Sequence, residues 1–358
     1  MRNKNHKIFI VAGEASGDIY GAQIAGEILS SSSAEIRGWG GDIMSSAGVH
    51  VSKHYSELAF MGFVEVLLNL RTIRRNLNSC WNEIVNFKPD AVVLVDFPGF
   101  NMRIARKAKK AGIKTYQVIC PQVWAWKASR IKKLKRDYDA VFPALPFEDQ
   151  VLKKGGVNSQ SLGHPIIDTF DNFKYEKKKG LIALLPGSRR QELRKMLPVL
   201  IEVSQRLKEY DFVIAGAPGL KKEDYGDLGD VELVFGDTRK ILAESEMAIV
   251  TSGTATLEAA LLGTKQLIAY KTSELNYLIA KALVKVKHIG LPNLILGREI
   301  VPELIQNDCT SAKIIEQIKV IRQESAQISG YKELREKLGI SGASKRIANY
   351  IIKDSSSS

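Results

Sequence analysis

Short apolar runs alternate with helical stretches along almost the whole chain. The clearest runs are residues 7–12, 36–41, 90–96, 115–119, 140–142, 181–185, 212–216, 231–235 and 247–250. Most of them are apolar at consecutive positions, which is typical of strands buried on both faces of a parallel sheet. The intervening stretches predict helices, so the pattern favours an α/β fold with parallel sheets.

The strand and helix rhythm restarts after residues 162–168, which we interpret as a linker. His164 precedes a proline and is therefore held extended, which fits a hinge residue better than a mobile ligand. A chain of 358 residues is long enough for two domains with separate cores. We predict two Rossmann-like domains, 1–165 and 166–358, with strand ends facing a shared cleft. The division also allows the terminal helices to pack back on the N-terminal domain.

Composition narrows the class of protein. The hydrophobic content of 45% and charged content of 25% are those of a soluble globular protein. The 3 cysteines are widely spaced and form no CxxC pair, so the sequence supports neither a disulfide framework nor a zinc site. We therefore expect a cytoplasmic protein. No apolar run reaches the ~20 residues of a spanning helix.

The net charge of +13 is unevenly distributed. Residues 103–136 contain 12 Lys or Arg and no Asp or Glu. This block indicates an anionic partner, which could be nucleic acid, an anionic lipid surface or a phosphorylated substrate. A solvated helix face in a basic protein is the other interpretation.

Two stretches combine apolar or aromatic residues with basic ones. Residues 58–70 include Met61 and Phe63 in a nearly continuous apolar run that precedes three arginines. Such a helix suits a membrane interface or an acyl-chain groove, although a buried core helix fits equally well. Trp124 and Trp126 precede a basic helix and could cover a sugar ring or enter a lipid headgroup layer.

The second half contains two candidate anion sites at strand-to-helix turns. Ser252, Gly253 and Thr254 form a small-residue turn before a helix whose N-terminus would attract phosphate, and Glu258 could accept from a ribose diol. An ordinary βα turn of a parallel sheet is the other interpretation of these residues. Ser188 with Gln191 predicts a capping box. Arginine in a first helical turn opposes the helix dipole, so Arg189 indicates a bound anion.

Acidic residues follow strands in the first half. Asp96 ends a buried strand, where open α/β sheets place their ligands, and is a candidate general base; a structural cap is the alternative. Glu14 would repel phosphate, so its corner suits a sugar or an acceptor hydroxyl, and Ser16 or Asp18 is expected to cap the next helix. The Asp137-Tyr-Asp139 motif precedes its strand, so we reject it as a metal site.

These residues resemble the lipid-A-disaccharide synthases, which are inverting glycosyltransferases of the GT-B type. The matching motifs are Ala12-Gly-Glu-Ala-Ser-Gly-Asp18, Met61-Gly-Phe-Val-Glu-Val66, Asp96 with Phe100-Asn101, Pro121 through Trp126, Leu145-Pro-Phe-Glu148, Gly163-His-Pro165, Leu185-Pro-Gly-Ser-Arg189, Ser252 through Gly263, and Gly290 through Glu303. They span most of the chain. It departs from many members at Gly99, where they carry a second Asp, and at Cys120, where they carry Ser.

The resemblance implies transfer of a sugar from UDP-2,3-diacylglucosamine to the 6-hydroxyl of 2,3-diacylglucosamine 1-phosphate. The products would be the β-1,6-linked disaccharide 1-phosphate and UDP. Asp96 would act as the base, with Glu14 as the second candidate, and Arg189 would stabilise the departing diphosphate without a metal or other cofactor. The residues expected to bind UDP-sugar are Ser188, Arg189, Ser252, Gly253, Thr254, Glu258, Asn293 and Arg298.

The resemblance also implies a place for the enzyme in the cell. Ser16, Met61, Phe63, Trp124 and Trp126 would face the acyl chains and the membrane, with the basic block on anionic headgroups. We expect a peripheral protein of the inner membrane of a Gram-negative-type bacterium, either monomer or homodimer, that binds no nucleic acid. The alternatives are another GT-B UDP-sugar transferase and a UDP-sugar epimerase, for which an acyl groove would have no use.

Overall fold

The computed structural model describes residues 5–58, 69–120, 129–170, 175–274, 277 and 287–356. It divides the chain into two compact units. Unit 1 comprises Met1–Thr169 with Leu338–Ser358, and unit 2 comprises Phe170–Lys337. The last helix therefore belongs to unit 1 although its sequence follows unit 2. The boundary also lies four residues beyond the predicted position 165.

Unit 1 is built on a parallel six-stranded sheet of order β3-β2-β1-β4-β5-β6. The strands are β1 (His6–Ala12), β2 (Ala34–Gly40), β3 (His50–His54), β4 (Ala91–Val95), β5 (Lys114–Val118) and β6 (Ala140–Phe142). The central strands are buried on both faces, as their continuous apolar runs predict. The edge strand β3 is polar and half-exposed, so its sequence carries no such signal.

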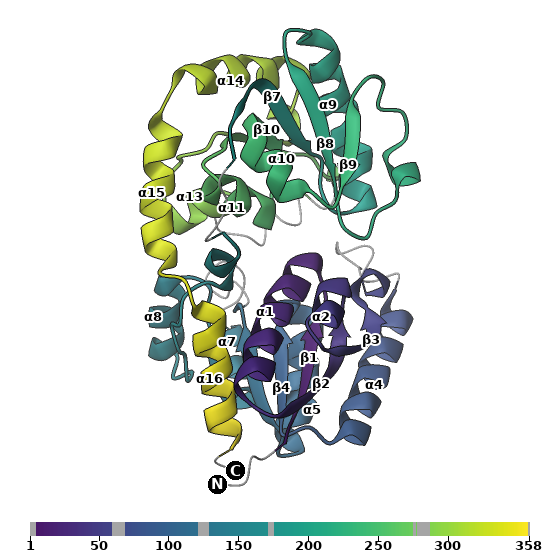
Figure 1. Cartoon of the computed structure of the whole chain (residues 1–358), viewed down its shortest axis with the longest axis vertical. Coiled ribbons are helices and arrows are strands. Elements are labelled where there is room, and N and C mark those ends of the chain that lie inside the picture. The colour runs from purple at the N-terminus through teal and green to yellow at the C-terminus, as the bar shows by residue number, and fades with distance from the viewer. Residues whose placement is uncertain are drawn as a thin grey trace. The chain divides into compact units, whose positions relative to one another are not determined.

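Helices cover both faces of this sheet (Figure 1). They are α1 (Ala15–Ser31), α2 (Asp42–Ser46), α4 (Leu70–Phe87), α5 (Pro98–Lys110), α7 (Ser129–Asp137), α8 (Pro146–Lys154) and α16 (Ala343–Ser355), with 3-10 turns at Tyr55–Glu57 and Pro165–Thr169. One core lies under α4, α5 and α7, where Ile84, Ile104 and Leu134 pack with strand residues. On the other face α16 lies beside α1.

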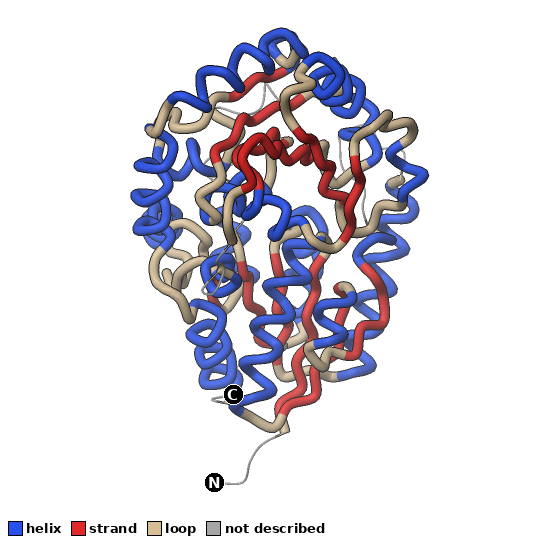
Figure 2. Tube along the Cα trace, turned by 45° about the horizontal axis from the view of Figure 1, so that its top comes forward, coloured by secondary structure: helices blue, strands red, loops and turns tan. Residues whose placement is uncertain are grey.

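Unit 2 repeats the plan with the strand order β12-β11-β10-β7-β8-β9. Figure 2 shows its strands in red. The strands are β7 (Lys178–Leu185), β8 (Asp211–Gly216), β9 (Glu232–Phe235), β10 (Ser245–Val250), β11 (Lys265–Tyr270) and β12 (Glu303–Ile305). The helices are α9 (Arg190–Arg206), α10 (Thr238–Glu244), α11 (Thr254–Leu261), α13 (Leu291–Leu296), α14 (Ser311–Gln323) and α15 (Ala326–Leu338), with 3-10 turns at Lys222–Tyr225 and Gln306–Asp308.

The two segments that connect the units are fastened to each other within unit 1. Asp168 accepts the backbone N–H groups of Gly342 at 2.6 Å and Ser344 at 2.8 Å, which caps α16. Arg346 in α16 donates to the carbonyl of Leu162 at 3.0 Å. A carboxylate at a helix N-terminus also complements the helix dipole. The return of α16 to unit 1 thus has a specific polar anchor.

His164 lies buried in this connection. Its Nδ1 accepts the N–H of Ile166 at 3.0 Å, and its ring meets the edge of Tyr20 at 5.6 Å between centroids. Burial lowers the pKa of His164 to about 4, and the nearby Asp168 carboxylate only partly opposes the shift. The ring is therefore neutral in the folded protein at neutral pH.

No described helix combines the length and the apolar character needed to cross a membrane. The described part of residues 58–70 consists of Leu58, which is buried, and the last two positions, where α4 begins. Met61 and Phe63 lie outside the described residues, so the two interpretations of this run remain predictions.

We predict that His164 makes unit 1 acid-sensitive. Below pH 6.5 the His164 ring binds a proton in the unfolded chain but stays neutral in the folded protein. The free energy of unfolding therefore falls as the pH drops toward 4. His164→Asn keeps an acceptor for the N–H of Ile166. Between pH 7 and pH 5 its free energy of unfolding should fall by roughly 2 kcal/mol less than that of the wild type. All four tryptophans lie in unit 1, so urea unfolding followed by their fluorescence measures this difference. The matched control is the exposed His50→Asn; equal pH slopes for His164→Asn and wild type would contradict the prediction.

Candidate functional site

Two strand-to-helix turns leave the sheet of unit 2 side by side. Strands β7 and β10 pair in parallel with Leu185 opposite Val250, and the N–H of Thr251 donates to the carbonyl of Leu185 at 2.9 Å. The turns after the two strands therefore start at the same edge. The sequence predicted an anion site at each of them, and the fold makes them neighbours.

The turn after β10 presents the N-terminus of α11. Gly253 adopts φ +145 and ψ −165, a conformation that residues with a side chain rarely adopt. The hydroxyl of Ser252 donates to the carbonyl of Ile289 at 2.9 Å, which fixes the turn against the segment before α13. The helix begins at Thr254, so the first N–H groups of α11 have no partner within the helix. This arrangement suits a phosphate.

The turn after β7 differs from the prediction. The helix α9 begins at Arg190 and its N-cap is Arg189, so the predicted capping box of Ser188 and Gln191 is wrong. Glu192 takes that role: its carboxylate accepts the N–H of Ser188 at 2.9 Å and the Arg189 guanidinium at 3.0 Å. A carboxylate in the first helical turn satisfies both partners and complements the helix dipole, which an amide cannot do.

Glu192 therefore holds Arg189 at the edge of the sheet. The arginine side chain remains 31% exposed, whereas that of Glu192 is 11% exposed. Tyr270, at the end of β11, lies close enough for both charges to act on it. Burial and the Glu192 carboxylate raise the pKa of Tyr270, while a hydrogen bond with Thr272 and the charge of Arg189 lower it. The sequence did not predict Glu192 or Tyr270 as site residues. Glu192 follows the predicted capping box directly, and Tyr270 follows the apolar residues of β11.

Glu258 lies in the second turn of α11 and already has a cationic partner. It accepts from Nε of Arg239 in α10 at 3.1 Å, and the Arg239 guanidinium lies 5.0 Å from the ring centre of Phe170. Burial raises the pKa of Glu258, and Arg239 opposes this shift. A carboxylate offers several acceptor sites, so the pairing is compatible with a ribose hydroxyl.

The side chain of Asn293 is bonded within unit 2. Its side chain is fully buried, and its amide oxygen accepts from Ile300 and Val301 at 2.8 and 3.0 Å. Its amide nitrogen donates to the carbonyl of Val301 at 2.7 Å and to Glu303 at 2.8 Å. These four bonds use the full capacity of the amide, so the side chain has an internal role, and the expected nucleotide contact stays a prediction.

The network around Asn293 supports the first turn. Glu303 also accepts the N–H groups of Ile289 at 2.8 Å and Gly290 at 3.0 Å, and the carbonyl of Ile289 is the acceptor for Ser252. Arg298 lies outside this network, exposed and paired with Glu333 of α15. The sequence placed both residues in the nucleotide pocket, but they have different environments.

In unit 1 the two candidate bases leave neighbouring strands. Ala12 of β1 lies opposite Val95 of β4, so Glu14 and Asp96 follow at the same edge. Glu14 is the N-cap of α1, and Ser16 lies half-buried in the first turn of that helix. Both positions agree with a polar corner at the end of β1.

Asp18 has a different partner from the one predicted. It accepts the N–H groups of Gly41, Ile43 and Met44 at 2.7, 3.1 and 3.1 Å, so it caps α2. Helix α1 has no side-chain cap, which makes the predicted capping by Ser16 or Asp18 wrong. The preference of aspartate for helix N-termini is fulfilled at a different helix.

Backbone strain marks the end of β4. Asp96 and Phe97 have φ of +46 and +47, in the left-handed region that costs roughly 1–3 kcal/mol for a residue with a side chain. The Phe97 ring lies against Gly13, where a Cβ would come within 2.3 Å of it. Burial raises the pKa of the Cys120 thiol, and Glu148 and Asp96 raise it further, which places the Asp96 charge near the end of β5.

The structure describes the acidic motif of residues 137–139 but not the two tryptophans of the predicted acceptor side. Asp137 pairs with Arg136, and Asp139 pairs with Lys109 at 2.6 Å, so each carboxylate of the rejected motif has a cationic partner. Trp124 and Trp126 lie outside the described residues, and their predicted contacts remain predictions.

Comparisons with known proteins cover almost the whole chain. The family model described as "Lipid-A-disaccharide synthetase" matches residues 8–350. The lipid-A-disaccharide synthase of Geobacter sulfurreducens is 36% identical over 98% of this chain and 98% of its own. That of Myxococcus xanthus is 32% identical over 97% of each.

Solved structures resemble the fold at lower identity. The UDP-GlcNAc 2-epimerase of Methanocaldococcus jannaschii, in complex with UDP-GlcNAc and UDP, has a TM-score of 0.66 at 12% identity and covers 97% of this chain and 99% of its own. The calicheamicin glycosyltransferase has a TM-score of 0.59 at 15% identity, with 98% of each chain covered. The predicted α/β fold of GT-B type, with two Rossmann-like sheets, is confirmed.

We predict that Asn293 contributes stability and Arg298 does not. Asn293→Ala leaves the part-buried N–H of Ile300 and the buried N–H of Val301 unpaired and should cost roughly 2–4 kcal/mol of unfolding free energy. The exposed Arg298→Ala should change it by less than about 0.5 kcal/mol. Urea unfolding followed by circular dichroism measures both. A variant Asn293→Ala of normal stability that binds UDP poorly would contradict the internal role.

Proposed function

Since the chain belongs to the family of lipid-A-disaccharide synthases and is an enzyme of lipid A biosynthesis, we propose that it transfers the sugar of UDP-2,3-diacylglucosamine. The acceptor is the 6-hydroxyl of 2,3-diacylglucosamine 1-phosphate, and the products are the β-1,6-linked disaccharide 1-phosphate and UDP. The observation that supports the chemistry is the left-handed backbone that carries the Asp96 carboxylate at the carboxyl end of β4.

Asp96 is the base in this proposal. It takes the proton of the acceptor hydroxyl as the oxygen attacks the anomeric carbon and the bond to UDP breaks in a single inverting displacement. Strained residues cluster where a side chain must be aimed, and two consecutive left-handed residues end β4. Glu14, at the end of the neighbouring strand, is the second candidate, and Ser16 contributes to the acceptor side.

The donor is held by unit 2. We assign its diphosphate to the turn of Ser252, Gly253 and Thr254 and to Arg189 with the neighbouring Ser188. The Arg189 charge, oriented by Glu192, offsets the negative charge that develops on UDP as it leaves. Glu258 accepts from the ribose, and Asn293 supports the pocket from behind through Glu303. Arg298 would reach the nucleotide by leaving Glu333.

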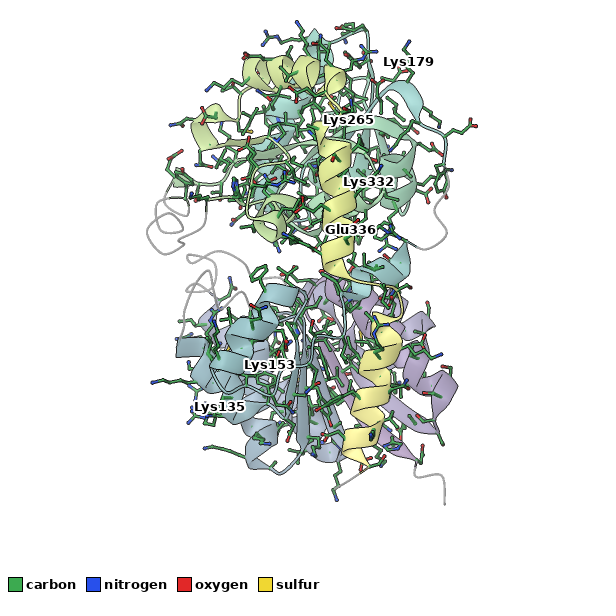
Figure 3. The ribbon with its side chains drawn as sticks, turned by 90° about the vertical axis from the view of Figure 1, so that its left-hand side faces the viewer. Lys135, Lys153, Lys179, Lys265, Lys332 and Glu336 are labelled. Atoms are coloured by element: carbon green, nitrogen blue, oxygen red, sulfur yellow. The ribbon has the colours of Figure 1, made fainter. Side chains whose placement is uncertain are left out.

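The basic face of unit 1 is assigned to an anionic membrane surface. Helices α4, α5 and α7 pack over one core, and many of their outward side chains are basic. The exposed ones are Arg71, Arg74, Arg75, Arg103, Arg106, Lys109, Lys110, Lys132, Lys133, Lys135 and Arg136. Lys135 marks this surface in Figure 3. Cationic side chains near anionic headgroups favour peripheral binding, and the acyl chains of both substrates require access to a lipid layer.

We predict that Asp96→Ala lowers turnover at least ~10²-fold, the usual contribution of general-base catalysis, while UDP still binds. The assay is UDP release from the two acylated sugars, with UDP affinity measured in parallel. Glu14→Ala is the comparison variant. Because Glu14 is only the second candidate base, this variant should lose less turnover than Asp96→Ala. Wild-type turnover in Asp96→Ala would remove this residue from the mechanism.

Arg189→Ala should weaken both UDP binding and turnover, because the guanidinium contacts the diphosphate before and during its departure. Loss of a charged hydrogen bond predicts an affinity decrease of roughly 10-fold or more. Arg190→Ala is the matched control, since the adjacent arginine is 67% exposed and pairs with Asp224. A decrease in acceptor affinity alone would contradict the assignment of Arg189.

Binding to anionic vesicles should be salt-sensitive and should depend on the basic face. Lys132→Glu with Lys133→Glu is expected to reduce sedimentation with the vesicles at low salt, and added salt should weaken wild-type binding. Lys221→Glu with Lys222→Glu changes the net charge of unit 2 equally and serves as the control. Equal losses in both double variants would attribute binding to net charge and contradict a specific face.

A further inference from the structure

The carbonyl of Asp96 receives hydrogen bonds from two buried amides. Nδ2 of Asn101 in α5 donates to it at 2.7 Å, and Nε2 of Gln117 in β5 lies 3.3 Å from it. Asn101 and Gln117 are both fully buried. They belong to different elements, so the strained end of β4 is hydrogen-bonded to both α5 and β5.

Gln117 connects this strand end with a second strained residue. Its Nε2 also lies 3.2 Å from the carbonyl of Val118 and 3.0 Å from that of Ile119. Ile119 has φ +60, a rare conformation for a β-branched residue. Three carbonyl oxygens surround this atom, so only the nitrogen of the amide fits there. One side chain thus joins the ends of β4 and β5.

Both amides donate to backbone carbonyls at the ends of β4 and β5, and Nδ2 of Asn101 also lies 3.2 Å from the carbonyl of Val95. Within the described part of the chain, Oδ1 of Asn101 and Oε1 of Gln117 are buried and accept no hydrogen bond. Gln117 lies opposite Leu94 and Val141 in the sheet, both of which belong to the apolar core under α5 and α7. A leucine would suit that core better, because it has no polar atom to leave unsatisfied.

We infer that Gln117 and Asn101 are positioning residues, which hold the left-handed backbone of Asp96 so that its carboxylate points at the acceptor hydroxyl. This inference rests on the proposed role of Asp96 as the base. The amides donate to the Asp96 carbonyl, so they act on the reaction through Asp96. Catalytic groups displaced by about 1 Å commonly lose on the order of 10² in rate, which sets the scale of the effect.

The test is a double-mutant cycle on turnover. Gln117→Leu should lower kcat roughly 10- to 100-fold and leave the donor KM and the UDP affinity within about threefold of wild type. In the Asp96→Ala background the same substitution should have no further effect on kcat, because the group it positions is gone. Asn101→Leu should behave in the same way.

Gln266→Leu is the matched control in unit 2. Gln266 is also a fully buried amide on a strand, donating to Thr256 at 2.9 Å, and its Oε1 likewise accepts no hydrogen bond from the described residues. Its loss should lower the melting temperature but leave kcat near the wild-type value. Melting curves and UDP affinity confirm that each variant is folded, and Gln117→Met replaces Gln117→Leu if the latter does not fold.

Two results would overturn the inference alone, and a third would overturn the proposed base as well. A folded Gln117→Leu with wild-type kcat shows that the amide does not position Asp96. Equal decreases in kcat with and without Asp96 show a general structural role. Full activity of Asp96→Ala itself removes the proposed base, and the inference with it, so the two failures are distinguishable.

Discussion

Burial of both faces of a parallel sheet is the constraint on which the rest of the structure depends. Helices must cover each face, so polar chemistry is confined to the loops at the edges of the sheet. In unit 1 the carboxyl ends of β1, β4 and β5 bring Glu14, Asp96 and Ile119 to one edge. In unit 2 the ends of β7, β10 and β11 do the same for Arg189, Ser252 and Tyr270.

The same constraint explains which strands the sequence could predict. A strand buried on both faces appears as a continuous apolar run, and β1, β4, β7 and β10 were predicted from such runs. The edge strands β3 and β12 carry no apolar run because they are short or half-exposed. Strand β11 is internal to the sheet, but its buried Gln266 interrupts the apolar pattern. The side-chain amide of Gln266 donates to the carbonyl of Thr256, and its backbone N–H donates to Gln327, which follows 61 residues later.

Polar partners were predicted less well than strands, because their choice depends on distant parts of the chain. Asp18 suits a helix cap by type, but the helix it caps begins more than twenty residues later. Asn293 suits a nucleotide pocket by its motif, yet four internal bonds occupy its amide. Glu192 displaced Gln191 as the partner of the α9 turn, since a charged acceptor binds a guanidinium and an N–H more strongly. Sequence spacing alone does not rank these competitors.

Strain is distributed between the units according to what each turn must offer. In the proposed function the two turns of unit 2 bind the diphosphate through backbone N–H groups, so glycine can occupy their left-handed positions, as Gly187 and Gly253 do at φ +117 and +145. The proposed base requires a carboxylate at the end of β4. Glycine at this position would relieve the backbone strain, but it would also remove that carboxylate. Asp96 therefore combines a side chain with a left-handed backbone. Other groups have to stabilise this backbone conformation, which glycine would adopt without strain. The buried amides of Asn101 and Gln117 bond to that backbone, whereas the Ser252–Thr254 turn is joined to the α13 segment through the hydroxyl of Ser252.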